Sequence, residues 1–539
     1  MPYSAHRDTF ARDNLPPRDQ WPEFPLLLPE LHYPERMNAA TMLLDRAVER
    51  GWGGRLAIAT PEGLRWSYAD LLAHANRIAR VLTEDLGLVP GNRVLLRAPN
   101  SPLHAACWFA VLKAGGIAVG TMPLLRAGEL TAIITKARIS HALCDHRLAT
   151  ELEAARPDCP MLATVVLFGT EAADGLDAQA AKKSPAFANV DTAADDTALI
   201  AFTSGTTGKP KGTMHFHRDV MAACDCWPRS TLHASPDDLF AGSPPLAFTF
   251  GLGGLLLFPL SIGAATLLLE RPAPESLLPT VARYRVSVLV TAPTAYRSMA
   301  AQTQAHDLSS LRKCVSAGEA LPASTRQLWK QATGIEIIDG IGATEMFHIF
   351  ISHDEAHAKP GATGRPIPGY VACVMDASGN PVPPGEVGLL VVKGPTGCRY
   401  LADERQSTYV KGGWNYTGDA YLIDADGDFV YQARTDDMIV SAGYNIAGPE
   451  VEAALLLHPA VAECGVVGVP DEERGQVVKA FVVLKPGVAA DAGTTRDLQD
   501  YVKETIAPYK YPRAIEYLPE LPRTGTGKLQ RARLRQRPQ

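Results

Sequence analysis

The sequence predicts an α/β fold with a large N-terminal domain and a small, mobile α+β domain at the C-terminus. In the first three quarters of the chain, short apolar runs alternate with helix-length segments, which favours layered parallel sheets with helices on both faces. Near residue 385 this alternation gives way to short strands and turns, which indicates a β portion at the end of the large domain. The length of 539 residues also exceeds what one hydrophobic core usually organises.

The alternation begins after an N-terminal arm. Residues 1–40 are rich in proline and aromatic residues, and we expect them to wrap the surface in an extended form. An amphipathic helix is expected at 39–50, and a second helix follows Ser67, whose hydroxyl suits the N-cap position. Further strands are expected at 93–96, 116–119, 141–144, 199–202, 286–290 and 335–338, and further helices at 103–114 and 130–137.

The domain boundary is predicted at residue 436, which gives a large domain at 1–435 and a small domain at 436–539. The pattern of the small domain predicts a helix at 449–457, strands at 461–469 and 479–484, a helix at 494–505 and a polar tail. About 100 residues are enough for a separate folding unit.

Composition narrows the class of protein. A formal net charge of -6 gives no reason to expect nucleic acid or a membrane surface as a partner. Nine scattered cysteines fit buried thiols in a reducing cytoplasm, and the N-terminus lacks an apolar signal segment. Residues 239–269 carry no charge, but their three prolines and five glycines indicate buried core rather than a membrane span.

The most informative stretch is 203–212, T-S-G-T-T-G-K-P-K-G, directly after the apolar run 199–202. Glycines allow backbone N–H groups to converge on oxygens, hydroxyls add donors, and the two lysines supply charge against a polyphosphate. A P-loop of the Walker type is excluded because Pro210 follows Lys209, and a flexible linker would not need lysines at fixed places. We assign phosphate binding to Thr203, Ser204, Gly205, Thr206, Thr207, Gly208, Lys209 and Lys211.

Three further clusters carry chemistry. In 339–346, a strand is expected to run into a Gly-x-Gly turn that ends in Thr344 and Glu345; a hydroxyl there suits the α-phosphate and a carboxylate suits Mg²⁺. In 416–419, Asp419 at the end of an expected turn suits the two hydroxyls of a ribose, although Gly-Asp is also common in plain turns. Lys528 stands in a glycine turn of the small domain, from which it can swing into a distant site; the alternative is a plain basic tail.

Together these segments resemble those of the adenylate-forming superfamily, which includes acyl- and aryl-CoA synthetases, peptide-synthetase adenylation domains and luciferases. The resemblance covers essentially the whole chain. It implies that Lys528 bridges the substrate carboxylate and the α-phosphate, that Asp436 is the hinge between the domains, and that the Gly443 loop borders the CoA channel. It also implies ATP contacts by Gly318, Glu319, Asp339, Gly340, Ile341, Gly342, Asp419 and Arg434.

Some positions depart from the family pattern. Ile341 stands where the family often has an aromatic residue on the adenine, Ala433 replaces a glycine, and Gly448 replaces a proline. None of these changes removes a catalytic side chain. The resemblance therefore implies two half-reactions: a carboxylate and ATP give an acyl-adenylate and pyrophosphate, and CoA then displaces AMP. The expected partners are ATP, Mg²⁺, coenzyme A and a small carboxylic acid, with no protein nucleophile.

The acid is expected to be a small aromatic carboxylate. Residues 344–350, T-E-M-F-H-I-F, and 248–253, F-T-F-G-L-G, resemble segments of benzoate-CoA and 2-aminobenzoate-CoA ligases. A flat ring needs aromatic and aliphatic walls with few polar anchors. His348 suits an ortho amino or hydroxyl group, and it suits a buried core histidine equally well. We assign acid binding to Phe248, Thr249, Ala317, Gly342 and His348.

Other functions share these motifs. A stand-alone adenylation enzyme that loads a carrier protein uses the same first half-reaction; we expect no carrier domain in cis, since the chain ends eleven residues after Lys528. A CoA ligase for a small aliphatic acid is a further alternative. A nucleotide-binding protein without catalysis would be expected to lack Lys528 or Glu345. A homodimer is left open.

Overall fold

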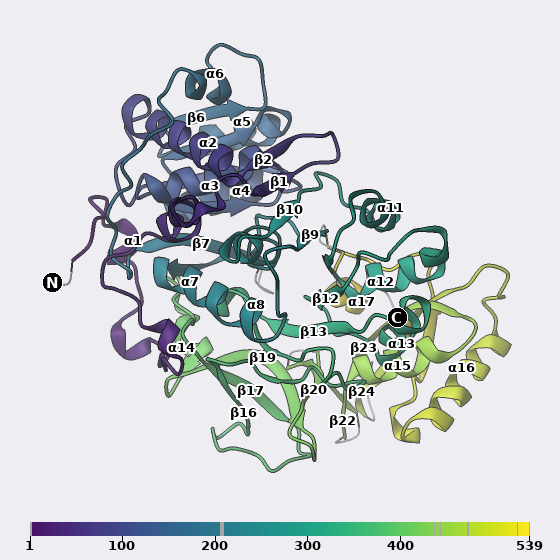
Figure 1. The fold of residues 1–539 in the computed structure, drawn as a ribbon. Helices are drawn as coiled ribbons and strands as arrows, with labels where there is room; N and C mark the ends of the chain where they lie inside the picture. The colour runs from purple at the N-terminus through teal and green to yellow at the C-terminus, as the bar shows by residue number, and fades with distance from the viewer. Residues whose placement is uncertain are drawn as a thin grey trace.

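The computed structural model describes residues 3–204, 210–435, 437–441, 444–471, 474–524 and 527–537. These residues form a mixed α/β structure with four sheets, two of them large and mainly parallel (Figure 1). The predicted fold class is therefore confirmed.

The first large sheet has six strands in the order β6-β5-β3-β4-β7-β8. Its first five strands are parallel, and β7 and β8 form an antiparallel hairpin at the edge. The predicted elements of this region occur within a few residues of their expected bounds, and Ser67 caps α2 as expected by accepting a hydrogen bond from the Asp70 amide. The strands are β3 (Arg93–Arg97), β4 (Ile117–Thr121), β5 (His141–Asp145), β6 (Thr164–Phe168), β7 (Thr197–Ser204) and β8 (Pro210–Phe216). The helices before β7 are α2 (Tyr68–Arg80), α3 (Pro102–Lys113), α4 (Ala127–Ala137), α5 (Ala149–Ala155) and α6 (Leu176–Ala181).

The second large sheet has nine strands in the order β15-β14-β13-β12-β11-β9-β10-β1-β2. Its central strands are parallel, and antiparallel strands close it at both edges. The strands are β1 (Leu56–Ala59), β2 (Arg65–Ser67), β9 (Leu239–Gly242), β10 (Ala265–Leu267), β11 (Val288–Thr291), β12 (Lys313–Ala317), β13 (Ile337–Gly342), β14 (Ile349–Ser352) and β15 (Arg365–Pro366). The associated helices are α7 (His217–Asp225), α8 (Trp227–Ser230), α9 (Thr249–Leu252), α10 (Phe258–Ser261), α11 (Pro274–Tyr284), α12 (Pro293–Met299) and α13 (Ala323–Thr333).

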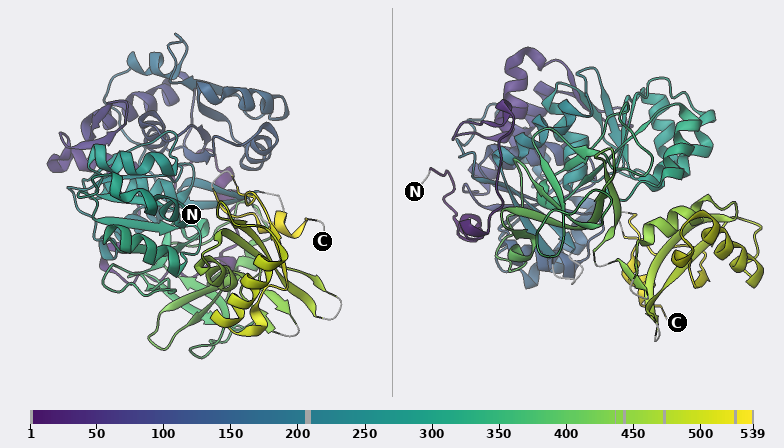
Figure 2. Two further views of the ribbon diagram at one scale, coloured as in Figure 1. Left: turned by 90° about the vertical axis from the view of Figure 1, so that its right-hand side faces the viewer. Right: turned by 90° about the horizontal axis from the view of Figure 1, so that it is seen from below.

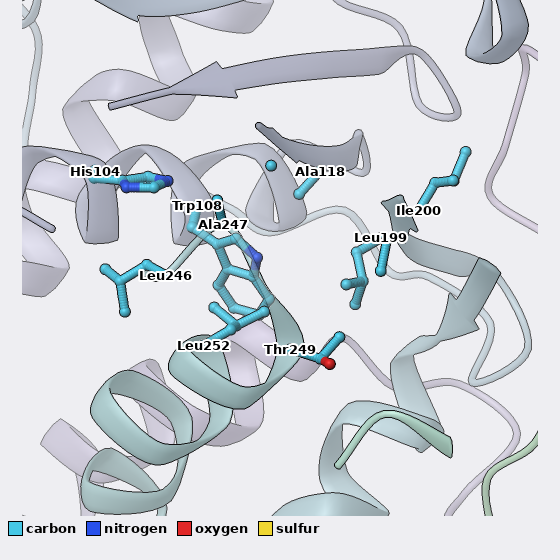
Figure 3. A pocket seen from close by; sticks show the side chains of 11 residues that line it. His104, Trp108, Ala118, Leu199, Ile200, Leu246, Ala247, Thr249 and Leu252 are labelled. Atoms are coloured by element: carbon cyan, nitrogen blue, oxygen red, sulfur yellow. The ribbon is translucent and has the colours of Figure 1, made fainter. Parts of the chain in front are cut away.

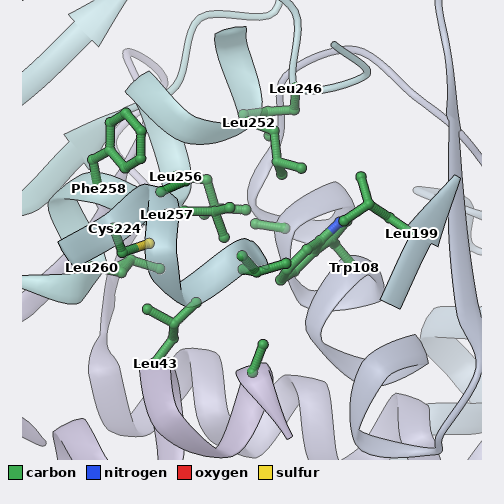
Figure 4. Close-up of a cluster of buried hydrophobic side chains, with 14 of the residues drawn as sticks. Leu43, Trp108, Leu199, Cys224, Leu246, Leu252, Leu256, Leu257, Phe258 and Leu260 are labelled. Atoms are coloured by element: carbon green, nitrogen blue, oxygen red, sulfur yellow. The ribbon is translucent and has the colours of Figure 1, made fainter. Parts of the chain in front are cut away.

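The uncharged stretch 239–269 lies in the main core, as expected. Leu252, Leu256, Leu257 and Phe258 are buried and pack in one cluster with Trp108 of α3 (Figure 4). Of the helices in the described ranges, none combines the length and the apolar character that a bilayer span needs.

The β portion follows the second large sheet. It is a five-stranded antiparallel sheet in the order β16-β17-β19-β18, with β20 added beside β19. Its elements are β16 (Val371–Met375), β17 (Gly388–Lys393), α14 (Gln406–Tyr409), β18 (Val410–Lys411), β19 (Trp414–Ile423) and β20 (Phe429–Arg434).

The C-terminal residues build a sheet of their own in the order β22-β21-β24-β23, with β25 beside β24. The right-hand view of Figure 2 shows this part standing beside the rest of the chain. The prediction of a plain polar tail is wrong in one respect. The tail carries a short helix whose Leu534 is buried in a cluster with Val467 and Phe481. The elements are β21 (Ile439–Ser441), β22 (Tyr444–Ile446), α15 (Gly448–Leu457), β23 (Val461–Asp471), β24 (Gly475–Leu484), α16 (Ala492–Thr505), β25 (Ala514–Tyr517) and α17 (Arg531–Arg535).

The N-terminal arm is mostly irregular and carries one short helix, α1 (Phe10–Asp13). Trp21 and Phe24 of this arm pack over the guanidinium of Arg399, which is fully buried and paired with Asp219 of α7. The helix expected at 39–50 occurs, with π-helical segments at Thr41–Asp45 and Val48–Trp52. The arm is thus anchored to the large domain by two aromatic rings that pack against a buried ion pair.

Candidate active site

The predicted phosphate loop joins the antiparallel strands β7 and β8. Thr203 pairs with Lys211 across this hairpin, and Ser204 pairs with Pro210. Lys211 is therefore the second residue of β8, opposite the end of β7. Five of the predicted contacts lie outside the described residues: Gly205, Thr206, Thr207, Gly208 and Lys209.

Glu345 lies in a short 3₁₀ turn, Thr344–Met346, between β13 and β14. Both flanking carbonyls of this turn accept hydrogen bonds: His215 Nε2–H donates to the Thr344 carbonyl at 2.8 Å, and the Thr396 hydroxyl donates to the Met346 carbonyl at 2.7 Å. The Glu345 side chain is buried, and its Oε1 accepts a hydrogen bond from the Tyr400 hydroxyl. The turn thus holds one carboxylate in a fixed place.

The phosphate hairpin and this carboxylate are neighbours. The ammonium of Lys211 lies 5.4 Å from the centre of the Tyr400 ring, whose hydroxyl bonds to Glu345. Among the described residues, none donates a hydrogen bond to the second carboxylate oxygen, Oε2. Mg²⁺ in nucleotide sites usually takes one or two carboxylates together with substrate phosphates. Glu345 fits that requirement.

The Gly-x-Gly segment differs from its expected form. We expected a turn, but Gly340 and Gly342 are part of β13 and pair with Ser352 and Ile349 of β14. A side chain at Gly342 would lie 2.8 Å from the His348 backbone, so the glycine permits the close approach of the two strands. This approach brings Ile341 and Gly342 beside the segment that carries His348.

A buried polar network supports the start of this strand pair. Burial raises the pKa of Asp339 to about 7, against the lowering effect of the Arg326 charge. Arg326 forms an ion pair with Glu336 at 2.8 Å and donates to His353 Nε2 at 2.9 Å. Nε2 also accepts from the Asp339 amide at 3.3 Å, so this imidazole is neutral. The network fixes the backbone that begins the ATP segment.

Asp419 and Arg434, the two predicted ribose contacts, form one pair on adjacent strands. They are opposite each other in the β19–β20 ladder, and Arg434 Nη1 lies 3.1 Å from Asp419 Oδ1. We expected Asp419 to stand at the end of a turn, but residues 417–419 form a bulge within β19, with Gly418 at a φ of 77°. Positive φ is accessible to glycine at little cost, which explains the residue type.

Lys528 reaches the large domain. A methyl group placed on Gly318, at the turn after β12, would lie 3.6 Å from Lys528 Cε and 3.9 Å from Nζ. The side chain keeps contact with solvent, yet desolvation lowers its pKa and outweighs the raising effect of Glu319. The charges of Asp419 and Arg434, at the predicted ribose site, also act on this pKa. The C-terminal motif therefore lies against the Gly318 turn of the large domain.

Cations of the small domain also affect the pKa of Glu319, the residue after Gly318. Burial raises the pKa of its carboxyl group, while the charges of Arg523, Lys528 and Arg531 lower it. All three cations come from the small domain. Ala317, one residue before Gly318, is buried at the end of β12.

His348 lies among aromatic rings. Its ring centroid is 4.4 Å from Phe258, 5.6 Å from Phe250 and 5.7 Å from Trp227. Burial lowers the pKa of His348 to about 3, so the ring is neutral. Nε2–H donates to the Phe250 carbonyl at 3.3 Å, whereas Nδ1 is buried and accepts no hydrogen bond from the described residues.

Thr249 borders a small cavity of about 10 Å³. Its walls come from α3, β4, β7 and the 246–252 segment, with Trp108, Leu199 and Leu252 around Thr249 (Figure 3). A cavity of this size holds about one water molecule, so it is not the space for an aromatic acid. Phe248 immediately precedes Thr249 and is half-buried.

Two other predicted residues, Asp436 and Gly443, lie outside the described residues. The structure also adds residues that sequence reasoning missed, namely Tyr400, His215 and the Arg326–His353 pair. No local pattern distinguishes Tyr400 from an ordinary buried tyrosine, because its partner Glu345 is 55 residues away.

Comparison with known proteins gives consistent matches over most of the chain. The family model of AMP-binding enzymes matches residues 44–400, and that of the AMP-binding enzyme C-terminal domain matches residues 450–528. A benzoate–CoA ligase of Thauera aromatica is 35% identical over 94% of this chain and 97% of its own length. The fold of the present chain is also similar to those of two solved ligases. A crystal structure of an anthranilate CoA ligase with anthranoyl-AMP has a TM-score of 0.90 and 35% identity, covering 94% and 98% of the two chains. A benzoate CoA ligase from Burkholderia xenovorans LB400 has a TM-score of 0.85 and 32% identity, covering 93% and 100%.

Proposed function

Because the chain belongs to the AMP-binding enzyme family and is an AMP-forming acyl-CoA synthetase, we propose that it activates a small aromatic carboxylate of the benzoate or 2-aminobenzoate type. The carboxylate attacks the α-phosphorus of ATP, and pyrophosphate leaves. The CoA thiol then attacks the carbonyl carbon of the aryl-adenylate, and AMP leaves. Relatives that act on benzoate and anthranilate support this choice of acid.

In the first step, Lys528 stabilises the negative charge that develops between the carboxylate and the α-phosphate, and Thr344 donates a hydrogen bond to that phosphate. Fixed charges and donors of this kind are the largest contribution in many enzymes. Glu345 would hold Mg²⁺, which supplies positive charge against the phosphates. The position of Lys528 beside Gly318 supports this assignment. Asp419 and Arg434 hold the ribose.

The second step needs a different arrangement of the small domain. We keep the predicted boundary at residue 436, with Asp436 as the hinge and the Gly443 loop at the CoA channel. Withdrawal of Lys528 by rotation about this hinge would open the thioester-forming site, as in other enzymes with closing domains.

His348 carries the proposal for an ortho-substituted ring. Its Nε2 proton is donated to the Phe250 carbonyl, and the buried Nδ1, an acceptor among aromatic rings, receives no hydrogen bond from the described part of the chain. An unsatisfied buried acceptor costs about 1–3 kcal/mol. An ortho amino or hydroxyl group on the substrate can donate to it, which favours 2-aminobenzoate or salicylate over benzoate.

Two variants test this assignment. His348→Gln retains an amide donor near the Nε2 position and removes the acceptor at Nδ1, whereas His348→Asn places an acceptor near Nδ1. We expect the ratio of kcat/KM for 2-aminobenzoate over benzoate to fall about tenfold in His348→Gln and to fall less in His348→Asn, since a hydrogen bond of this kind is worth about 1 kcal/mol or more. Equal ratios in all three proteins would rule out the contact.

The alternatives are outcomes of the same assays. Loading of a carrier protein predicts aryl-adenylate formation without a CoA thioester, and an aliphatic CoA ligase predicts turnover of short-chain acids only. The nine free cysteines suit a reducing compartment such as the cytoplasm. A homodimer stays a prediction.

A further inference from the structure

The turn that carries Glu345 is held by three side chains from two other segments of the chain. His215 of β8 and Thr396 bind the backbone carbonyls on either side of Glu345, and Tyr400 binds its carboxylate. The two backbone contacts fix the turn, but they leave the torsions of the glutamate side chain free. Tyr400 alone among these three contacts the carboxylate itself.

We propose that Tyr400 is a positioning residue for the metal-binding carboxylate, because its hydroxyl occupies Oε1 of Glu345 and thereby reserves Oε2 as the metal ligand. This inference rests on the proposed role of Glu345. A hydrogen bond to an ionised carboxylate is stronger than one between neutral groups. The hydrogen bond restricts the rotation of the carboxylate before the ion binds. Without it, this rotational freedom would be lost on binding and would weaken the affinity for the ion.

Tyr400 is itself held firmly. Its side chain is 1% exposed, and its segment lies antiparallel to β8, where Thr213 is its bridge partner. Its amide donates to Gln406 Oε1 at 2.9 Å, and the Gln406 amide group donates to the carbonyl of Gln20 in the N-terminal arm at 2.8 Å. A hydroxyl fixed from several sides can define the position of its partner.

Tyr400 also contacts the phosphate hairpin through Lys211. The Lys211 ammonium lies 5.4 Å from the centre of the Tyr400 ring, while the hydroxyl at the end of the ring binds Glu345. One side chain therefore contacts both a proposed phosphate-binding cation and the proposed metal carboxylate. Replacement by phenylalanine keeps the ring under Lys211 and removes only the contact to Glu345.

A purely structural role for Tyr400 would need a different test, and the chain offers a matched control. Tyr409 packs edge-on against Tyr400 at 5.8 Å, and within the described ranges its buried hydroxyl has no hydrogen-bond partner. Tyr409→Phe removes a hydroxyl from the same aromatic cluster without touching Glu345. Any effect of Tyr400→Phe beyond that of Tyr409→Phe is specific to the carboxylate contact.

The experiment measures metal binding without turnover. Mn²⁺ is titrated by electron paramagnetic resonance into each protein saturated with α,β-methylene-ATP, and melting temperatures are recorded in parallel. We expect Mn²⁺ to bind about tenfold more weakly or worse to Tyr400→Phe, as when outer partners of metal ligands are removed. Tyr409→Phe should match the wild type. In the double variant with Glu345→Gln, loss of Tyr400 should add little further effect.

Two results would overturn the proposal, and they differ. If Glu345→Gln weakens Mn²⁺ binding while Tyr400→Phe and Tyr409→Phe both bind like the wild type, the positioning role is wrong and the metal role of Glu345 stands. If Glu345→Gln leaves Mn²⁺ binding unchanged, the proposed metal ligand is wrong and the inference falls with it. A lower melting temperature of Tyr400→Phe with unchanged Mn²⁺ binding would assign the residue to stability alone.

Discussion

Replacement of Lys528 by alanine tests the adenylation geometry most sharply. The ammonium lies at the Gly318 turn, where the charges of Glu319, Asp419 and Arg434 act on its pKa, so its loss removes one positive charge from the place where the α-phosphate is proposed to react. The small domain would keep its fold, because the lysine side chain is exposed and makes none of the contacts in the buried clusters around Val466 and Val467.

The size of the effect follows from the charge. Two unit charges about 4 Å apart interact by about 4 kcal/mol at an effective dielectric constant of about 20. Since Lys528 keeps contact with solvent, which screens its charge, we expect a smaller loss of about 2–3 kcal/mol. This corresponds to a rate of adenylation about 30- to 150-fold lower.

The two half-reactions are measured separately. ATP–pyrophosphate exchange reports adenylation, and thioester formation from a synthetic aryl-adenylate and CoA reports the second step. Lys528→Ala should slow the exchange and leave the second step within about twofold of the wild type. Arg533→Ala, which removes an exposed cation from α17, is the control for a general effect of the basic tail.

An equal loss in both half-reactions would refute the reasoning, since a lysine that acts only on the α-phosphate has no role in thioester formation. Unchanged exchange in Lys528→Ala would refute it more directly. The same loss in Arg533→Ala would return the motif to a plain basic tail.

Three further predictions follow from the titratable groups. Because Lys528 must be protonated and Glu319 raises its pKa, Glu319→Gln should move the alkaline limb of the pH–exchange profile to lower pH; a shift to higher pH would contradict this. Burial raises the pKa of Asp339 to about 7, above its unfolded value, so this group makes the protein less stable as pH rises toward 7. Asp339→Asn should increase the free energy of unfolding at pH 8 by up to roughly 4 kcal/mol, which is measured as a higher melting temperature, and the gain should be smaller at pH 5.5. Asp219→Ala leaves the buried Arg399 charge unpaired, and unfolding in urea should report a loss of about 3–5 kcal/mol that is partly restored in the double variant with Arg399→Met.

The alternation of apolar runs and helices was enough to place six strands and several helices of the large domain to within a few residues, whereas strands such as β6, β9, β10 and β12 were not predicted. Each of these elements buries its own apolar face, so its pattern is local. The Gly-x-Gly turn was predicted wrongly for the opposite reason. Gly340 and Gly342 look like turn residues, but their small size is needed for close pairing with β14, a strand that follows them.

The sequence indicated a chemistry for the candidate site, and the structure shows part of the corresponding geometry. Glycines, hydroxyls, lysines and carboxylates in short motifs indicated Glu345, Asp419 and Lys528, and the structure brings Lys528 and Asp419 near each other and Glu345 beside Lys211. Tyr400 could not be predicted, because its function depends on a contact made only after the chain has folded. Buried ion pairs such as Arg399–Asp219 were missed on the same grounds.

The central claim is that this synthetase activates an aromatic acid, and product analysis tests it most directly. Purified protein is incubated with ATP, Mg²⁺ and CoA and, separately, with benzoate, 2-aminobenzoate, salicylate and short-chain fatty acids, and nucleotides and thioesters are quantified. We predict AMP together with an aryl-CoA thioester, and faster turnover of the aromatic acids than of the aliphatic ones. Formation of AMP and thioester with aliphatic acids alone would contradict the claim.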